Sequence, residues 1–163
     1  MSTCPPARDL RWQPATLADP EELRRALPRV IAYWRDWMRG TPGGAPRTAA
    51  RGKCEQTFAL AVIEAALVGR EDARAMAALQ RAAADYGAAP RAKPIDPQEL
   101  CDELGLLRHA IWRCVTEYHP DDEARMCFVG ALDYTISVAV QATLRGGYRA
   151  ELAERARRQE AGD

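Results

Sequence analysis

Residues 126–144, MCFVGALDYTISVAVQATL, carry the clearest structural signal in the chain. Drawn as an α-helix, this stretch is apolar around most of its circumference, and Asp133 is the polar exception in the row 126, 129, 133, 136, 140. Apolar and polar residues do not alternate with the period of a strand. The pattern therefore predicts a helix at the centre of an all-α fold.

The flanks of this helix indicate its limits. Pro120, Asp121 and Asp122 are typical of a helix start, and the pair Gly146-Gly147 is expected to break the helix. Residues 148–159 carry charges on most faces, so this last segment is expected to project or fray.

Two further helices begin with an Asp-Pro pair. The sequences DPEE (19–22) and DPQE (96–99) each place an N-cap aspartate before a proline and end on a glutamate that favours the helix dipole. These starts predict helices over 19–39 and 96–118. Pro28 is expected to kink or divide the first of them, because proline removes a backbone hydrogen bond.

Two alanine-rich helices are expected between these two, over 48–68 and 71–87, and each is followed or closed by a glycine, Gly69 or Gly87. The whole pattern predicts one helical bundle of about five to six helices. The bundle is expected over 19–146, with a flexible N-terminal arm over 1–18 and a charged C-terminal helix or tail over 147–163.

Composition narrows the class of protein. The 163 residues include 23 basic and 23 acidic side chains, so net charge favours neither nucleic acid nor an anionic membrane as a partner. Uninterrupted apolar runs fall short of the roughly 20 residues that span a bilayer. The N-terminus, MSTCPPARDL, lacks the features of a secretory signal. We therefore expect a soluble, cytoplasmic protein.

Five cysteines form no CxxC pair, and their odd number and wide spacing favour reduced thiols over disulfides or a zinc site. Cys101, Cys114 and Cys127 do not share one helical face, because a spacing of thirteen residues rotates each by roughly 140° from the last. Core packing is the preferred reading. Cys114, beside Arg113, is the one candidate for a reactive thiol.

The conventional catalytic motifs are absent: there is no Gly-rich phosphate loop, HExxH, GxSxG or kinase signature. Two histidines offer little material for a metal site or a catalytic triad. We therefore expect neither an enzyme nor a cofactor. His119 is interpreted as capping a helix end and His109 as a partly exposed helix residue, with a haem or metal ligand as the alternative for His109.

Asp133 needs a partner, because an unpaired carboxylate within an apolar row is costly. Arg108 on the neighbouring predicted helix is the leading choice, so the sequence predicts an Asp133–Arg108 ion pair. Together with Glu103 it would form an internal polar cluster, either structural or a ligand site. A weaker hypothesis makes Glu103, Arg108 and Asp133 the centre of an all-α enzyme.

Aromatic side chains suggest a second kind of site. Trp34, Trp37, His109 and Trp112 could line the pocket of a small-molecule or haem-type carrier, although core packing explains the aromatic residues as well. A Soret band or a copurified ligand in the absorption spectrum would favour the carrier, and its loss in His109→Ala would locate the site.

Three short motifs resemble a known family. ELGLLR (103–108) resembles the E-x-x-L-L-R core of the RsbRD-type N-terminal domain, LPRVI (27–31) resembles its early L-P-x-L-L segment, and ALD (131–133) resembles its final core helix. That domain opens RsbT co-antagonist proteins of the bacterial stressosome. The stretch YGAAP (86–90) departs from the family, which has histidine and glycine there.

The resemblance implies a bacterial signal-transduction domain that senses or regulates through protein–protein contacts and has no chemistry of its own. It also implies that the usual output domain is absent, so the chain would act by docking to a regulator, kinase or STAS-type protein, or by forming a homodimer. This regulatory domain is the preferred function, and the small-molecule or haem-type carrier is the alternative.

Overall fold

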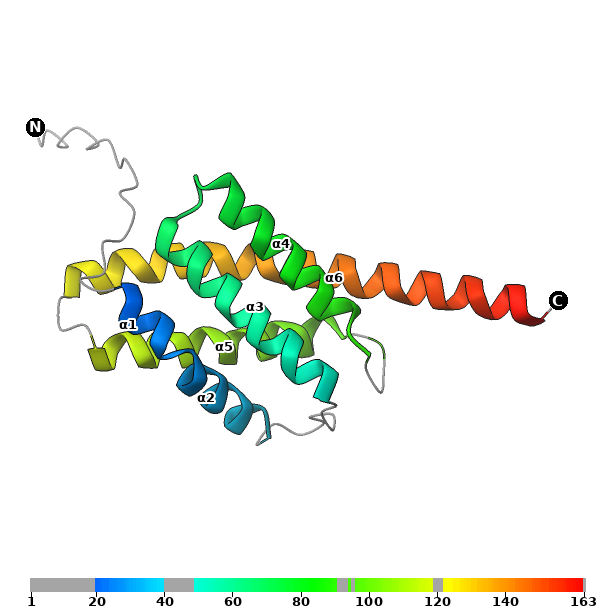
Figure 1. The fold of residues 1–163 in the computed structure, drawn as a ribbon, viewed down its shortest axis with the longest axis horizontal. Coiled ribbons are helices and arrows are strands. Elements are labelled where there is room, and N and C mark those ends of the chain that lie inside the picture. Colours follow the sequence, from blue (N-terminus) through cyan, green and yellow to red (C-terminus); the bar gives the residue numbers. More distant parts are fainter. Residues whose placement is uncertain (1–19, 40–48, 91–93, 95, 119–121, 163) are drawn as a thin grey trace, which may run out of the picture.

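The computed structural model describes residues 20–39, 49–90, 94, 96–118 and 122–162. These residues form six helices and no strand, which confirms the all-α bundle (Figure 1). Three predicted features lie outside the described residues: the arm over 1–18, the cap at Asp19 and the capping role of His119.

The first predicted helix is divided, as Pro28 suggested. Helix α1 is Pro20–Arg25 and α2 is Leu27–Arg39, with a turn at Ala26 between them. The Ala26 carbonyl accepts hydrogen bonds from the amides of Arg29 and Val30, so α2 starts within one residue of α1. Pro28 falls in the first turn of α2, where its missing N–H costs nothing.

Helix α3, Ala49–Val68, holds the central place in the bundle. It contacts α1, α2, α4 and α6, and its side chains are buried on several sides, among them Phe58, Val62, Ile63 and Ala66. Residues 126–144 lie in helix α6 (Asp122–Gly162), which contacts α3, α4 and α5 and so also packs within the bundle. The apolar content of that stretch is real, but part of it faces outward: Met126 is 67% exposed and Tyr134 is 45% exposed.

Local end signals explain where the next helices begin and end. Gly69 has a φ of 86°, the left-handed conformation that ends α3. Helix α4, Ala73–Ala88, is capped by Asp72, whose carboxylate accepts the Ala75 amide at 2.8 Å. Helix α5, Pro97–Tyr118, is capped by Asp96, which accepts the amides of residues 98 and 99 at 2.8 and 3.0 Å. The predicted Asp96 cap is confirmed.

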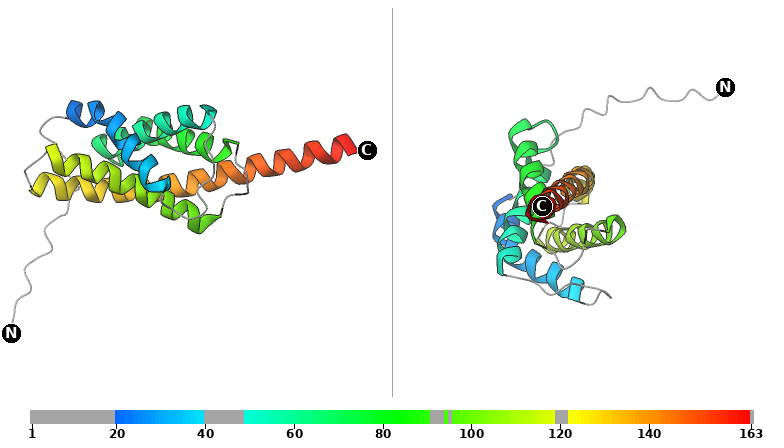
Figure 2. Two further views of the ribbon diagram at one scale, coloured as in Figure 1. Left: turned by 90° about the horizontal axis from the view of Figure 1, so that it is seen from below. Right: turned by 90° about the vertical axis from the view of Figure 1, so that its right-hand side faces the viewer.

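Helix α6, Asp122–Gly162, runs for 41 residues and does not break at Gly146-Gly147. The predicted break is wrong, because Gly146 serves close packing instead of ending the helix. A Cβ on Gly146 would fall on the backbone carbonyl of Ala84, and a Cβ on Gly87 would fall on that of Thr143. The backbones of α4 and α6 thus touch where they cross. Beyond the crossing, α6 extends past the other helices (Figures 1 and 2).

An aromatic cluster lies where α2, α3 and α4 meet. The ring centroids of Trp34 are 6.3 Å from Phe58 and 5.8 Å from Tyr86, and all three residues are fully buried. The Trp34 indole Nε1 also donates to the Glu103 carbonyl at 2.9 Å. This cluster joins α2 to α5 as well, so it connects four of the six helices.

The segment Glu123–Ala161 of α6 is long and apolar enough to cross a membrane, by length and composition alone. The core helix of a water-soluble protein passes the same test, and one face of α6 is buried against α4 and α3. The length of α6 therefore supports no membrane role by itself.

Candidate functional site

The predicted Arg108–Asp133 ion pair is present: Arg108 Nε donates to Asp133 Oδ1, joining α5 to α6. This hydrogen bond raises the pKa of Arg108 above its ordinary value. The internal placement that was expected is wrong, because the two side chains are 31% and 50% exposed. A pair at this level of exposure contributes about 0–1 kcal/mol to stability.

Glu103 has its own hydrogen bond, with a different helix. Its carboxylate accepts the Tyr86 hydroxyl on α4, whereas Arg108 is bonded to α6. These contacts do not define one polar cluster of Glu103, Arg108 and Asp133. The catalytic hypothesis that joined the three residues stays a prediction.

The four residues expected to line a pocket are divided between the core and the surface. Trp34 is fully buried, while His109 is exposed and Trp37 is half-buried. Trp37 presents its ring edge-on to His109, with centroids 6.4 Å apart at 81°. His109 Nδ1 lies 2.9 Å from the Gly105 carbonyl one turn back, which agrees with its reading as a helix residue. Trp112 packs against the core from α5.

A different set of residues gathers where α2 and α5 lie side by side. Each helix contributes a row at four-residue spacing, and the two antiparallel rows meet along the outside of the bundle. We call this set the α2–α5 surface; it comprises Arg29, Tyr33, Trp37, His109, Arg113, Glu117 and Tyr118.

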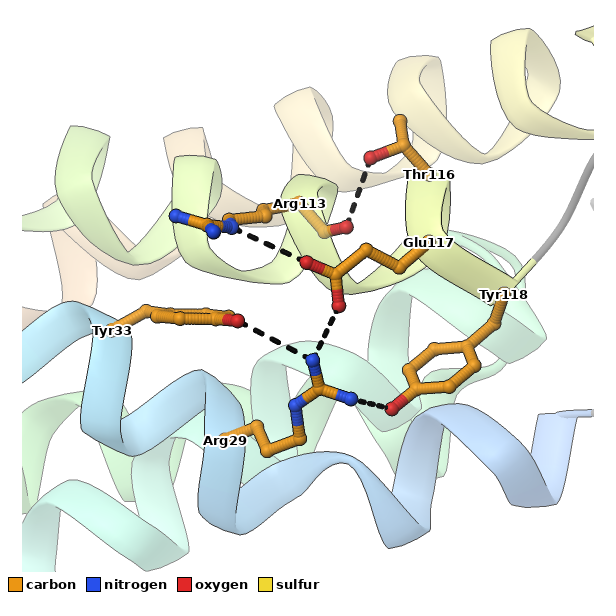
Figure 3. Close-up of polar contacts among 6 residues, drawn as sticks. All are labelled: Arg29, Tyr33, Arg113, Thr116, Glu117 and Tyr118. Carbon is orange, nitrogen blue, oxygen red and sulfur yellow. Dashed lines mark hydrogen bonds and ion pairs between the residues drawn. The ribbon is translucent and has the colours of Figure 1, made fainter.

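The contacts of this surface centre on one carboxylate (Figure 3). Arg29 donates to Glu117 Oε2 at 2.6 Å, and Arg113 donates to Glu117 Oε1 at 3.3 Å. Arg29 also donates to the Tyr118 hydroxyl and, at 3.3 Å, to that of Tyr33. The five side chains therefore hold one another in place across two helices.

Stacked planar groups continue the surface toward the other end of α2. The Arg113 guanidinium lies 4.3 Å from the centroid of the Tyr33 ring, which is a cation–π contact. Tyr33 stacks on Trp37 with centroids 6.1 Å apart at 17°. The planar side chains of Arg113, Tyr33, Trp37 and His109 thus form one continuous row, in which each group lies next to the following one.

The α2–α5 surface has a net positive charge. Two guanidiniums face one carboxylate, and the hydrogen bond that Arg29 donates to Tyr33, together with the nearby Tyr118 and Glu117, raises the pKa of Arg29. The α2–α5 surface therefore carries one more positive than negative charge, next to exposed aromatic faces.

The side chains of this surface are charged or aromatic and are bonded to one another. Arginine and glutamate bonded to each other offer no activated nucleophile, and the described residues hold no group of three His, Cys, Asp or Glu that could bind a metal ion. Trp, Tyr and Arg are the residue types that dominate the binding energy of protein interfaces.

Sequence reasoning missed most of this surface, although Trp37 and His109 were among the residues predicted to line a pocket. The signal was present as the rows 29, 33, 37 and 109, 113, 117, each at four-residue spacing. Nothing in one sequence says that α2 lies beside α5. The rows therefore read as two unrelated helix faces.

Cys114 lies beneath this surface and is fully buried. Burial, aided by the nearby charge of Glu117, raises the pKa of the Cys114 thiol to about 11, although Arg29 and Arg113 oppose the shift. Core packing is therefore confirmed for Cys114, whose thiolate, the reactive form, is scarce at neutral pH. For Cys101 and Cys127 the prediction of core packing is wrong, because both are exposed.

We expect brief iodoacetamide treatment at pH 7.5 to label Cys101 and Cys127, which are exposed, and to leave Cys114 unmodified. Mass spectrometry of tryptic peptides measures the labelling. Urea should make all three react alike, which controls for intrinsic differences in the peptides. Labelling of Cys114 as fast as that of Cys101 in the folded protein would contradict its burial.

Known proteins give no further guide to this site. No family model, no curated protein and no solved structure matches the chain.

Proposed function

We propose that this chain is a non-enzymatic regulatory domain that binds a partner protein through the α2–α5 surface. The observation that carries the proposal is the pair of guanidiniums held on Glu117 beside the stacked rings of Tyr33 and Trp37. The resemblance of ELGLLR, LPRVI and ALD to the RsbRD-type domain supports the same class of function.

The surface is preorganised for binding. Arg29 and Arg113 are already fixed by Glu117, so a partner would lose less side-chain entropy on binding than it would with free arginines. The half-buried rings of Tyr33 and Trp37 offer apolar area, and a bound partner would displace water from it. Both effects favour association.

The partner segment is proposed to be acidic with an apolar or aromatic residue. A carboxylate on the partner can bind the outer edge of either guanidinium, since each arginine has five N–H donors and Glu117 takes only part of them. A regulator, kinase or STAS-type protein with such a segment fits the signalling role.

Selection of displayed random peptides on the immobilised protein is expected to enrich sequences that combine Asp or Glu with an aromatic or leucine. Arg113→Glu should weaken binding of a selected peptide by about tenfold or more, because it reverses a charge at the centre of the surface. Fluorescence polarisation measures the affinity, which should fall as salt rises.

Arg81→Glu is the matched control. Arg81 is exposed on α4, which packs on α3 and α6, so its reversal should leave binding unchanged. Peptides without acidic residues, or equal binding by Arg113→Glu, would refute the proposal. An absorption band of a copurified ligand that disappears in His109→Ala would support the carrier instead.

A further inference from the structure

One face of α6 is exposed along its whole length. All four large apolar side chains that α6 exposes fall on it: Met126, Tyr134, Tyr148 and Leu152, at 67%, 45%, 49% and 63% exposure. They recur at intervals that keep them on one side of a helix. We call this face the α6 stripe; its exposed members are Glu123, Met126, Gly130, Tyr134, Ser137, Gln141, Tyr148, Leu152 and Arg155.

Gly130, a member of the α6 stripe, has no packing role within the bundle. A Cβ added to Gly130 would meet nothing within 4 Å, unlike one added to Gly146. Glycine in an exposed helix interior is less favourable than alanine by about 1 kcal/mol. A glycine at such a place leaves room for a bulky group that arrives from outside.

The C-terminal part of α6 also lacks a neighbour. The α4–α6 contact ends near Gly146 and Gly147, and the helix then continues alone to Gly162 (Figure 1). An isolated helical end of this length is only marginally stable in water. A second surface that covers Tyr148 and Leu152 would stabilise it.

We propose that a second copy of this chain covers the α6 stripe, with the two α6 helices antiparallel and centred at the level of Ala139. In this register, Gly130 faces the partner's Tyr148, so the bulky ring fills the open space over the glycine. Met126 faces the partner's Leu152, and Ser137 faces the partner's Gln141. Each of these facing pairs occurs twice in the dimer, as two-fold symmetry requires.

Charge complementarity selects the antiparallel direction. In the proposed register, Glu123 at one end of α6 faces the partner's Arg155 at the other end, on both sides of the symmetry axis. A parallel pairing in register would place Arg155 against Arg155 and leave a gap between two copies of Gly130. The antiparallel pairing also lays the isolated end of each helix along the bundle half of the other.

A lipid surface fits the stripe less well. Gln141, near its centre, accepts a hydrogen bond from Arg145 at 3.3 Å, and Glu123 and Arg155 lie at its ends. These polar groups suit a helix pair with matched charges better than the interior of a bilayer.

The dimer goes beyond the proposed function, because the α6 stripe and the α2–α5 surface share no residue. Each can fail in its test while the other stands. A two-fold dimer would present two copies of the α2–α5 surface, which raises the apparent affinity for a bivalent partner.

Sedimentation equilibrium of the full chain is expected to show a dimer. Gly130→Arg should raise the dimer Kd by about tenfold or more, since it fills the space that Tyr148 needs. Arg155→Glu should raise the Kd by about fivefold, and the double variant Glu123→Arg with Arg155→Glu should restore dimerisation. Arg149→Glu, also exposed on the isolated end but off the stripe, is the matched control.

Circular dichroism shows whether each variant keeps its helices. A folded wild-type chain that stays monomeric at about 100 μM overturns the proposal, and so does binding of that monomer to vesicles of mixed neutral and anionic phospholipid. A dimer that Gly130→Arg leaves intact overturns it as well. Failure of the charge swap to restore the dimer overturns the antiparallel register.

Discussion

Trp34→Ala is expected to lower the free energy of unfolding by about 4 kcal/mol, the cost of truncating a buried tryptophan. Trp34 is fully buried, packs on Phe58 and Tyr86, and donates its indole N–H to the Glu103 carbonyl. The substitution removes these contacts together and leaves a cavity among four helices. Urea unfolding followed by circular dichroism measures the loss.

Trp37→Ala is the matched control, because Trp37 lies on the same helix but is only half-buried. Trp37→Ala should lower the free energy of unfolding by less than half as much as Trp34→Ala. Trp34→Phe keeps most of the apolar area and loses the hydrogen bond to Glu103, so about 1–2 kcal/mol is expected. Equal losses for Trp34→Ala and Trp37→Ala would contradict the core position of Trp34.

Gly146→Ala is expected to destabilise the fold by about 3 kcal/mol, the upper range for overpacking. The added methyl group would fall on the backbone carbonyl of Ala84, and backbone cannot move aside as the end of a flexible side chain can. Helices α4 and α6 would have to separate where they cross. Thermal unfolding of the variant measures the effect.

Gly105→Ala makes the same change in α5, where a Cβ meets nothing within 4 Å. Here alanine should stabilise the protein by up to about 1 kcal/mol, because it favours the helix over the unfolded chain. The two substitutions thus carry opposite signs. If Gly146→Ala also stabilised the protein, the close crossing of α4 and α6 would be wrong.

Much of the fold was predictable because its signals are local. Asp96 caps α5, Gly69 ends α3 and Pro28 marks the division of the first helix, and each acts through the backbone of its own neighbours. These effects depend on a few consecutive residues, so one sequence is enough to read them.

The errors came from contacts between distant residues. Gly146 has the residue type of a helix breaker, and only its place against Ala84 explains why the helix continues. The apolar content of residues 126–144 suggested burial on most sides of that helix, but it cannot say whether each face is covered by this chain. The candidate site shows both cases: the Arg108–Asp133 pair was predicted, whereas the meeting of Arg29 and Glu117 required the arrangement of α2 and α5.

The length of α6 also governs how the molecule moves through a solvent. At 1.5 Å per residue, its 41 residues extend for about 60 Å, whereas a compact chain of 163 residues has a radius of gyration of about 15 Å. A rod of that length raises the frictional drag without adding mass. Elution volume from a sizing column would therefore overstate the mass of a single chain, and only methods that weigh the particle independently of its shape can count the copies.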